Sequence, residues 1–214
     1  MKKVIALFVF GSVFLAGCPK HEIIPAPTPK VELESNFIGT VNGSQIELTQ
    51  NVDGYYLDAT KTKLIQASPT PSTATYYANM KSSNGLVSVR VGLGVLQFDG
   101  SASSDPALTA FNSFFSSTTS PTYSDLAAAG FEVVYRDGSG NVWTSDEASP
   151  IPQNVEFTGI LQESDASGDY SKFTCTFDCV VYRDTPDLTT PDPNDVITLS
   201  MPITNAVFKG WFRR

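Results

Sequence analysis

The sequence predicts an all-β domain, an antiparallel β-sandwich of jelly-roll type with one or two short helices. From about residue 33 onward, apolar and polar residues alternate in short runs, which is the period of a half-buried strand. Turn residues separate these runs at intervals of roughly 8 to 15 residues, a spacing typical of antiparallel sandwiches. Strands and helices do not alternate in the way that builds a parallel sheet.

Three turn motifs predict hairpins. Asn42-Gly43 lies between two segments that bear apolar residues and is typical of a type I′ turn. Asn84-Gly85 and residues 137–140 separate two further pairs of runs. The clearest half-buried strand covers residues 86–98, in which valine or leucine occupies every second position from 87 to 95. The other expected strands are residues 75–80, 131–136, 141–145, 155–162, 172–182, 195–201 and 206–212.

Two helical pieces interrupt the strands. Residues 104–106, Ser-Asp-Pro, supply an N-cap, an acidic first turn and a proline at the first helical position. Leu108 and Phe111 then recur at helical spacing, followed by Phe114 or Phe115. Residues 124–130 predict one or two further turns that end at Gly130.

Cys175 and Cys179 are expected to be free thiols inside the domain. They alternate with polar residues in the expected strand 172–182, so both should lie on its buried face. Four residues along a strand span about 13 Å, whereas a disulfide needs Cα atoms within about 7 Å. A Cys-x₃-Cys metal pair is the alternative, but the only histidine, His21, precedes the domain.

The N-terminus follows the order of a secretory signal. Two lysines precede an apolar run at residues 4–14, which is shorter than the roughly 20 residues of a membrane-spanning helix. The tetrad that ends at Cys18, Leu-Ala-Gly-Cys, resembles the lipobox of bacterial lipoproteins. This resemblance implies that residues 1–17 are removed and that Cys18 carries lipid with acyl chains such as palmitate. Residues 18–33 then form a proline-rich tether, and residues 34–214 form one domain.

Charge limits the partners. The net charge is −8, and removal of residues 1–17 takes away two lysines and no acid, which leaves −10. Such acidity excludes a nucleic-acid partner, since affinity for phosphates rests on basic contacts. It also disfavours adhesion to anionic lipid. The lipid on Cys18 therefore has to supply the membrane contact.

Several strand and turn motifs resemble a broad group of small Gram-negative outer-membrane lipoproteins of unknown function. The motifs are residues 37–43, 130–145, 173–177 and 203–212. The resemblance implies a β-sandwich attached to the outer membrane and transfers no catalytic residue. Pro19 follows the cysteine, whereas aspartate at that position retains enteric lipoproteins in the inner membrane. Whether the domain faces the periplasm or the cell surface stays open.

The sequence offers few groups for catalysis or metal binding. The absence of histidine from the domain excludes Ser-His-Asp, Cys-His and His-metal arrangements. No cofactor is expected. Four aspartates of a Pro- and Thr-rich loop are weak candidates for a calcium site, against a plain solvated loop. They are Asp184, Asp187, Asp192 and Asp195. Residues 137–141 superficially resemble a calcium loop but fit a plain hairpin turn better.

The leading hypothesis is a non-enzymatic lipoprotein that binds a protein or glycan or has a structural role in the envelope. Weak candidates for ligand contacts are four aromatic residues, which otherwise cover the core: Tyr55, Tyr76, Trp143 and Trp211. The alternative is a histidine-free, carboxylate-dependent hydrolase directed at glycans. That activity needs two carboxyl groups about 5 Å or about 6.5–9.5 Å apart, a distance that the sequence does not supply.

The lipid anchor has a direct test. Cys18→Ala removes the thiol that the lipobox assigns to lipid, so the protein should leave the membrane fraction and lose labelling by a fatty-acid analogue. Fractionation and labelling of cells that express either form measure this. Cys175→Ala is the matched control and should keep the label, and continued labelling of Cys18→Ala would contradict the assignment.

Overall fold

The computed structural model describes residues 30–187, 189 and 195–214. The expected signal peptide, Cys18 and most of the expected tether lie outside these residues. Residues 30–33, which the sequence assigned to the tether, already run along the domain. Val31 is buried and its N–H donates to Oδ2 of Asp165 at 2.8 Å, and Leu33 packs against the core.

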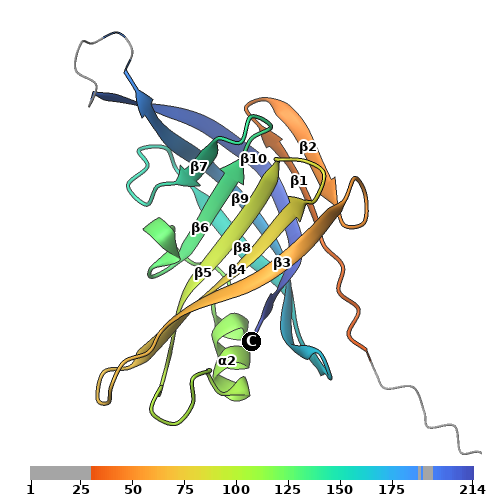
Figure 1. Ribbon diagram of the computed structural model, residues 1–214, viewed down its shortest axis with the longest axis vertical. Coiled ribbons are helices and arrows are strands. Elements are labelled where there is room, and N and C mark those ends of the chain that lie inside the picture. Colours follow the sequence, from red (N-terminus) through yellow and green to blue (C-terminus); the bar gives the residue numbers. More distant parts are fainter. Residues whose placement is uncertain (1–29, 188, 190–194) are drawn as a thin grey trace, which may run out of the picture.

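Ten strands form one antiparallel sheet in the order β2-β1-β10-β9-β7-β6-β5-β4-β3, with β8 added to β9. The sheet curls strongly, so that its opposite halves face each other across one core (Figure 1). The predicted all-β antiparallel class is therefore confirmed. The elements are β1 (Asn36–Val41), β2 (Ser44–Thr49), β3 (Tyr55–Leu64), β4 (Ser72–Ser82), β5 (Ser88–Phe98), α2 (Leu108–Ser117), η1 (Asp125–Ala127, a 3₁₀ turn), β6 (Phe131–Arg136), β7 (Val142–Ser145), β8 (Asn154–Asp165), β9 (Gly168–Pro186) and β10 (Val196–Arg213).

The three expected hairpins are present as β1–β2, β4–β5 and β6–β7. Asn42 and Gly43 have φ values of 48° and 79°, as a type I′ turn requires. The two strands expected at 195–201 and 206–212 form one strand, β10. It passes through an irregularity between Ile203 and Ala206, where Asn205 has a φ of 52°. The chain therefore bends there without ending its ladder with β9.

Strand β5 follows the predicted alternation only in its first part. Val89, Val91 and Leu93 are fully buried, but Leu96 is then buried in place of Val95. The register between β4 and β5 shifts at this point, and a slip of one residue exchanges the two faces of a strand.

Aromatic side chains fill the core. Phe173 and Phe212 stack with their ring centroids 4.6 Å apart, and Phe115 of α2 stacks on Phe212 at 4.7 Å. Tyr76 meets Phe111 and Phe115 edge to face at 5.3 and 5.2 Å. Helix α2 thus lies across the lower end of the curled sheet (Figure 1), and its Phe111 and Phe115 are buried in the core.

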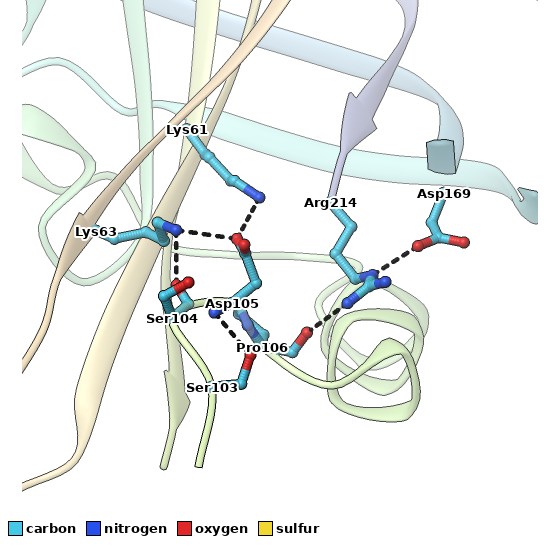
Figure 2. Close-up of polar contacts among 8 residues, drawn as sticks. All are labelled: Lys61, Lys63, Ser103, Ser104, Asp105, Pro106, Asp169 and Arg214. Carbon is cyan, nitrogen blue, oxygen red and sulfur yellow. Dashed lines mark hydrogen bonds and ion pairs between the residues drawn. The ribbon is translucent and has the colours of Figure 1, made fainter. Parts of the chain in front are cut away.

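The expected N-cap at residues 104–106 is wrong. The helix begins at Leu108, and no side chain caps its first turn. Asp105 is instead drawn to β3, where its carboxylate binds the Nζ atoms of Lys61 and Lys63 at 2.5 and 3.1 Å (Figure 2). Hydrogen bonding from Lys61, the largest influence, lowers the pKa of Asp105. Two ammonium groups therefore compete successfully with the backbone N–H groups of the helix.

The C-terminal residue holds the loop before α2 from the other side. Arg214 donates from Nε to Asp169 at 2.6 Å and from Nη1 to the carbonyl of Pro106 at 3.0 Å (Figure 2). The loop is thereby tied both to β3 and to the C-terminal end of the sheet.

The two cysteines are free and buried, as predicted. Burial raises the pKa of the Cys175 thiol and raises that of Cys179 to about 12. Both thiols are therefore neutral apolar groups at physiological pH. The expected helix at residues 124–130 is reduced to the single turn η1, in which Leu126 has a φ of 56°.

Tyr76 allows a test of the core. Its side chain is fully buried, and its hydroxyl has no hydrogen-bond partner among the described residues. Tyr76→Phe removes an unpaired polar group, so the free energy of unfolding should stay the same or rise by up to about 1 kcal/mol. Tyr76→Ala, which also removes the ring, should lower it by about 3–5 kcal/mol. Urea unfolding measures both. A clear loss of stability in Tyr76→Phe would contradict the unpaired hydroxyl.

Candidate ligand groove on the outer face of the sheet

The segment between α2 and β6 lies on the outer face of β5. The N–H of Gly94 donates to the carbonyl of Gly130 at 2.9 Å. A Cβ atom on Gly94 would lie only 1.9 Å from the carbonyl oxygen of Ala127, and one on Gly92 would lie 3.1 Å from the Ala127 Cβ. Two glycines on the polar face of β5 therefore let this loop approach the sheet closely.

Backbone bonds fix the loop in place. Phe131 donates its N–H to the carbonyl of Thr122 at 2.8 Å, and Ser124 donates to the carbonyl of Phe131 at 2.9 Å. Asp125 and Glu147 exchange backbone-to-carboxylate bonds of 3.0 and 3.2 Å. These contacts connect the loop to β6 and to the segment after β7.

Leu126, at the tip of this loop, combines two unfavourable properties. Its backbone is left-handed, with a φ of 56°, and its side chain is 75% exposed. A left-handed conformation costs an ordinary residue about 1–2 kcal/mol. Among the described residues, Leu126 is the most exposed of the large apolar side chains. The fold thus holds an apolar group out in solvent on a rigid support.

An ion pair between a buried carboxylate and a partly exposed guanidinium lies in the same row of the outer face. Glu132 pairs across the sheet with Gly92, is 1% exposed and receives a 2.8 Å bond from Nη2 of Arg90. The guanidinium of Arg90 also lies 4.9 Å from the centroid of the Tyr77 ring. Removing one partner of a fully buried pair typically costs about 3–5 kcal/mol, and the cost is smaller here because the Arg90 side chain is 38% exposed. Glu132 therefore supports the outer face beside the loop, and Arg90 neutralises its charge.

An open groove of about 560 Å³ lies between the loop tip and strands β7, β9 and β10. We call it the outer groove. Its floor follows the strand register, because Tyr182 pairs with Thr144 and Asp184 pairs with Thr198. The residues that line it are Asp125, Leu126, Thr144, Ser145, Asp146, Tyr182, Arg183, Asp184 and Thr198.

Local hydrogen bonds orient the polar side chains of the outer groove. Asp184 accepts from Oγ1 of Thr198 at 2.6 Å, and Asp146 accepts from the N–H of Ala148 at 2.7 Å. The hydroxyl of Tyr182 shares a 2.9 Å hydrogen bond with Ser149. A carboxylate can accept about four hydrogen bonds, so these groups keep accepting capacity for a ligand.

Trp143, one of the aromatic candidates, is held rigidly beside the outer groove. Its indole N–H donates to Oδ2 of Asp137 at 3.1 Å, and the guanidinium of Arg183 lies 5.3 Å from the ring centroid. Asp137 also accepts from the N–H groups of Ser139 and Asn141. Residues 137–141 are thus a hairpin turn whose carboxylate is used internally. Partial desolvation acts to raise the pKa of Asp137, but hydrogen bonds from Asn141 and Trp143 outweigh it and lower the pKa to about 2.

The four aromatic candidates do not form one binding face. Tyr76 lies in the core, and Trp211 is only 7% exposed. Tyr55 is half-buried at the start of β3 and packs against the core. Of the four, only Trp143 lies near the outer groove, because its ring contacts Arg183, which lines the groove. Each adjacent tyrosine pair places one ring inward and the other outward, as strand alternation predicts.

Three of the four acidic candidates lie within the described part of the chain. Asp184 lines the outer groove, whereas Asp187 accepts two bonds from Thr189, and its N–H donates to the carbonyl of Asp195. Asp192 lies outside the described residues. Within the described part of the chain, no group of three or more histidine, cysteine, aspartate or glutamate residues could hold a metal ion. Sequence reasoning missed Asp125, Leu126 and Asp146 as groove residues, because they belong to segments that meet only in the folded sheet.

Comparison with protein-family models, with curated proteins and with solved structures gives no match. The resemblance to outer-membrane lipoproteins therefore stays a prediction. Over residues 30–187, 189 and 195–214, no helix has the length and apolar character needed to cross a membrane.

The low pKa of Asp137 predicts an acid transition at Trp143. Because the folded pKa of about 2 lies below the ordinary value of about 3.9, the ionised carboxylate stabilises the turn above about pH 4. This contribution is lost as the pH falls through about 2. Tryptophan emission should therefore change between pH 4 and pH 2, with circular dichroism used to confirm that the sheet stays folded. Asp137→Asn should lack the transition, and the same transition in that variant would contradict the assignment.

Proposed function

We propose that the protein is a lipid-anchored, non-enzymatic binding module of the outer membrane that takes a glycan in the outer groove. The observation that carries the binding site is the lining of this groove. Three carboxylates, two threonines and a tyrosine surround it, and one exposed leucine borders it. The anchor rests on the signal sequence and on Cys18.

The tether leaves the domain away from the outer groove. Val31 is bonded to Asp165 at the β8–β9 turn, at the lower side of Figure 1, whereas the β9–β10 hairpin lies at the upper end. The polyproline II conformation that the sequence predicts for the tether would span roughly 37 Å over the twelve residue steps from Cys18 to Lys30, at about 3.1 Å per step. Two or three acyl chains on Cys18 would hold the protein on the membrane. The domain can therefore stand off the lipid with the outer groove uncovered.

The chemistry of the outer groove favours a ligand with many hydroxyl groups. Sugar hydroxyls can donate to the carboxylates of Asp125, Asp146 and Asp184, while Thr144 and Thr198 can donate or accept. The apolar face of a sugar ring can pack on Leu126 or Tyr182. A net charge of −10 for the chain without residues 1–17 disfavours acidic sugars. Neutral or amino-bearing oligosaccharides are thus the proposed ligands.

Exposure of the acids favours binding over hydrolysis. A glycosidase needs one carboxyl group whose pKa is raised by burial, so that it stays protonated. Asp125 and Asp184 are exposed, and the half-buried Asp146 accepts a hydrogen bond from the N–H of Ala148, which favours its ionised form. Glu132 is the one buried carboxylic acid among the described residues, and it is paired with Arg90. We therefore prefer a binding role to the hydrolase alternative.

A titration with oligosaccharides tests the proposal. Trp143 is the reporter, because Arg183 lies over its ring and also lines the outer groove. Neutral and amino-bearing oligosaccharides should change the tryptophan emission in a saturable way. Asp184→Asn and Leu126→Asp should each weaken binding at least tenfold.

Asp99→Asn is the matched control, since Asp99 is an exposed acid outside the outer groove that accepts hydrogen bonds from Ser101. It removes the same charge and should leave affinity unchanged. Equal affinity of Asp184→Asn and Asp99→Asn would contradict the proposed site. Absence of binding across a broad panel of oligosaccharides would contradict the glycan.

A further inference from the structure

The β9–β10 hairpin extends beyond the rest of the sheet as a two-stranded arm, at the upper left of Figure 1. We define the arm as residues 183–186 and 196–201. On β10, pairing with β1 begins only at Ile203, and the N–H of Asn42 takes the carbonyl of Pro202. On β9, pairing with β7 ends at Tyr182. Within the described residues, both outer edges of the arm therefore lack a neighbouring strand.

The two edges of the arm differ in chemistry. The β9 edge carries Arg183, Asp184 and Pro186, and charges and proline are the usual means of blocking an open edge. The β10 edge reads Val-Ile-Thr-Leu-Ser-Met over residues 196–201. It has no charge, no proline and no glycine, and it is rich in β-branched residues. Such a segment is well suited to accept another strand.

Apolar side chains on the β10 edge are left in solvent. Met201 and Ile203 are buried on the inner face, and alternation places Leu199 and Ile197 on that same face farther along the arm. They are 38% and 43% exposed, because the opposite half of the sheet does not reach them. A strand added to this edge with its own apolar row on the same face would cover them.

The same segment of a second copy supplies such a row. If Thr198 lies on a two-fold axis, Ile197 of each copy stands opposite Leu199 of the other, and the two inner faces become continuous. Seven residues, 195–201, then overlap before Pro202, whose carbonyl is already taken. An axis at Leu199 overlaps only five residues. An axis between Thr198 and Leu199 places Ile197 of one copy opposite Ser200 of the other, so that the inner face of one arm would continue into the outer face of the other. Asp195 is the one charged residue of this overlap, and it stands opposite Met201 of the other copy, so no like charges face each other.

We propose that residues 195–201, which are Asp195 and the first six residues of β10, pair antiparallel with the same residues of a second copy of this chain, with Thr198 on the two-fold axis. In this antiparallel pair, the arms of the two copies point in opposite directions. Two copies on one membrane would therefore lie with their arms along its surface, which a tether of roughly 37 Å permits. This inference does not depend on the glycan.

Crosslinking in intact membranes tests the proposed pair. In the full-length chain, Thr198→Cys places two thiols opposite each other, with Cβ atoms about 4.5–5.5 Å apart. An oxidant or a short bismaleimide should then give at least tenfold more covalent dimer than with Thr185→Cys, which lies on the β9 edge of the same arm. Labelling with a monofunctional maleimide confirms that both thiols are accessible. The unsubstituted chain, with two buried cysteines in the domain, gives the background.

A charge placed on the β10 edge provides a second test of the proposed pair. Leu199→Lys, added to Thr198→Cys, sets lysine near its symmetry mate and should lower crosslinking at least tenfold. Leu161→Lys is the matched control, because Leu161 is a similarly exposed leucine on β8, and it should leave crosslinking unchanged. Equal crosslinking of Thr198→Cys and Thr185→Cys, or no crosslinking of either, would overturn the proposal. Insensitivity to Leu199→Lys would overturn it as well.

Discussion

The antiparallel ladder between β9 and β10 is the interaction on which the other strands depend. It runs from Tyr170 paired with Arg213 to Pro186 paired with Val196. Strand β1 attaches to β10, while β7 and β8 share the outer edge of β9. In its lower half the ladder carries the phenylalanines of the core, and in its upper half it leaves the core. One backbone pairing thus provides both the centre of the fold and the arm.

The shape of the outer face depends on two glycines of β5. Where β5 carries Gly92 and Gly94, no Cβ atom keeps the loop before β6 away from the sheet. This close approach places Leu126 beside strands that are distant in sequence. The groove is therefore made by a loop on a rigid sheet, the usual arrangement in which scaffolds carry binding residues.

The sequence predicts strands most accurately where one face of the strand is buried and the other is exposed. For this reason buried residues alternate with more exposed ones around Val89 and Val91 of β5 and around the two cysteines of β9. The type I′ turn was predictable as well, because it depends only on its own residues, Asn42 and Gly43. Strand β3 was not identified from the sequence, because half of it is exposed and alternation loses meaning there. Lys61 and Lys63 on this strand bind the carboxylate of Asp105. The segment that was predicted to cap the helix is therefore held at β3. Contacts between distant segments decide such outcomes, and a local pattern does not contain them.

The candidate site was less predictable than the fold. Residues 124–130 are rich in alanine and favour a helix locally, but bonds from Ser124 to Phe131 and from Gly94 to Gly130 give the loop another backbone path. Asp125 and Asp146 become neighbours only through that path. The register of β9 with β10 then adds Asp184 and Thr198 to the same groove.

The position of the tether beside β1 has a mechanical consequence. The chain enters the domain at Val31 and continues into β1, which pairs with β10 over residues 203–209. A force between the membrane and a partner held at the arm would pull β1 and β10 along their lengths in opposite directions. All the hydrogen bonds of that ladder would then share the load together, whereas a force across the strands would open them one by one. The pairing of β1 with β10 would therefore resist a pull from the two ends of the domain better than a pull across its strands.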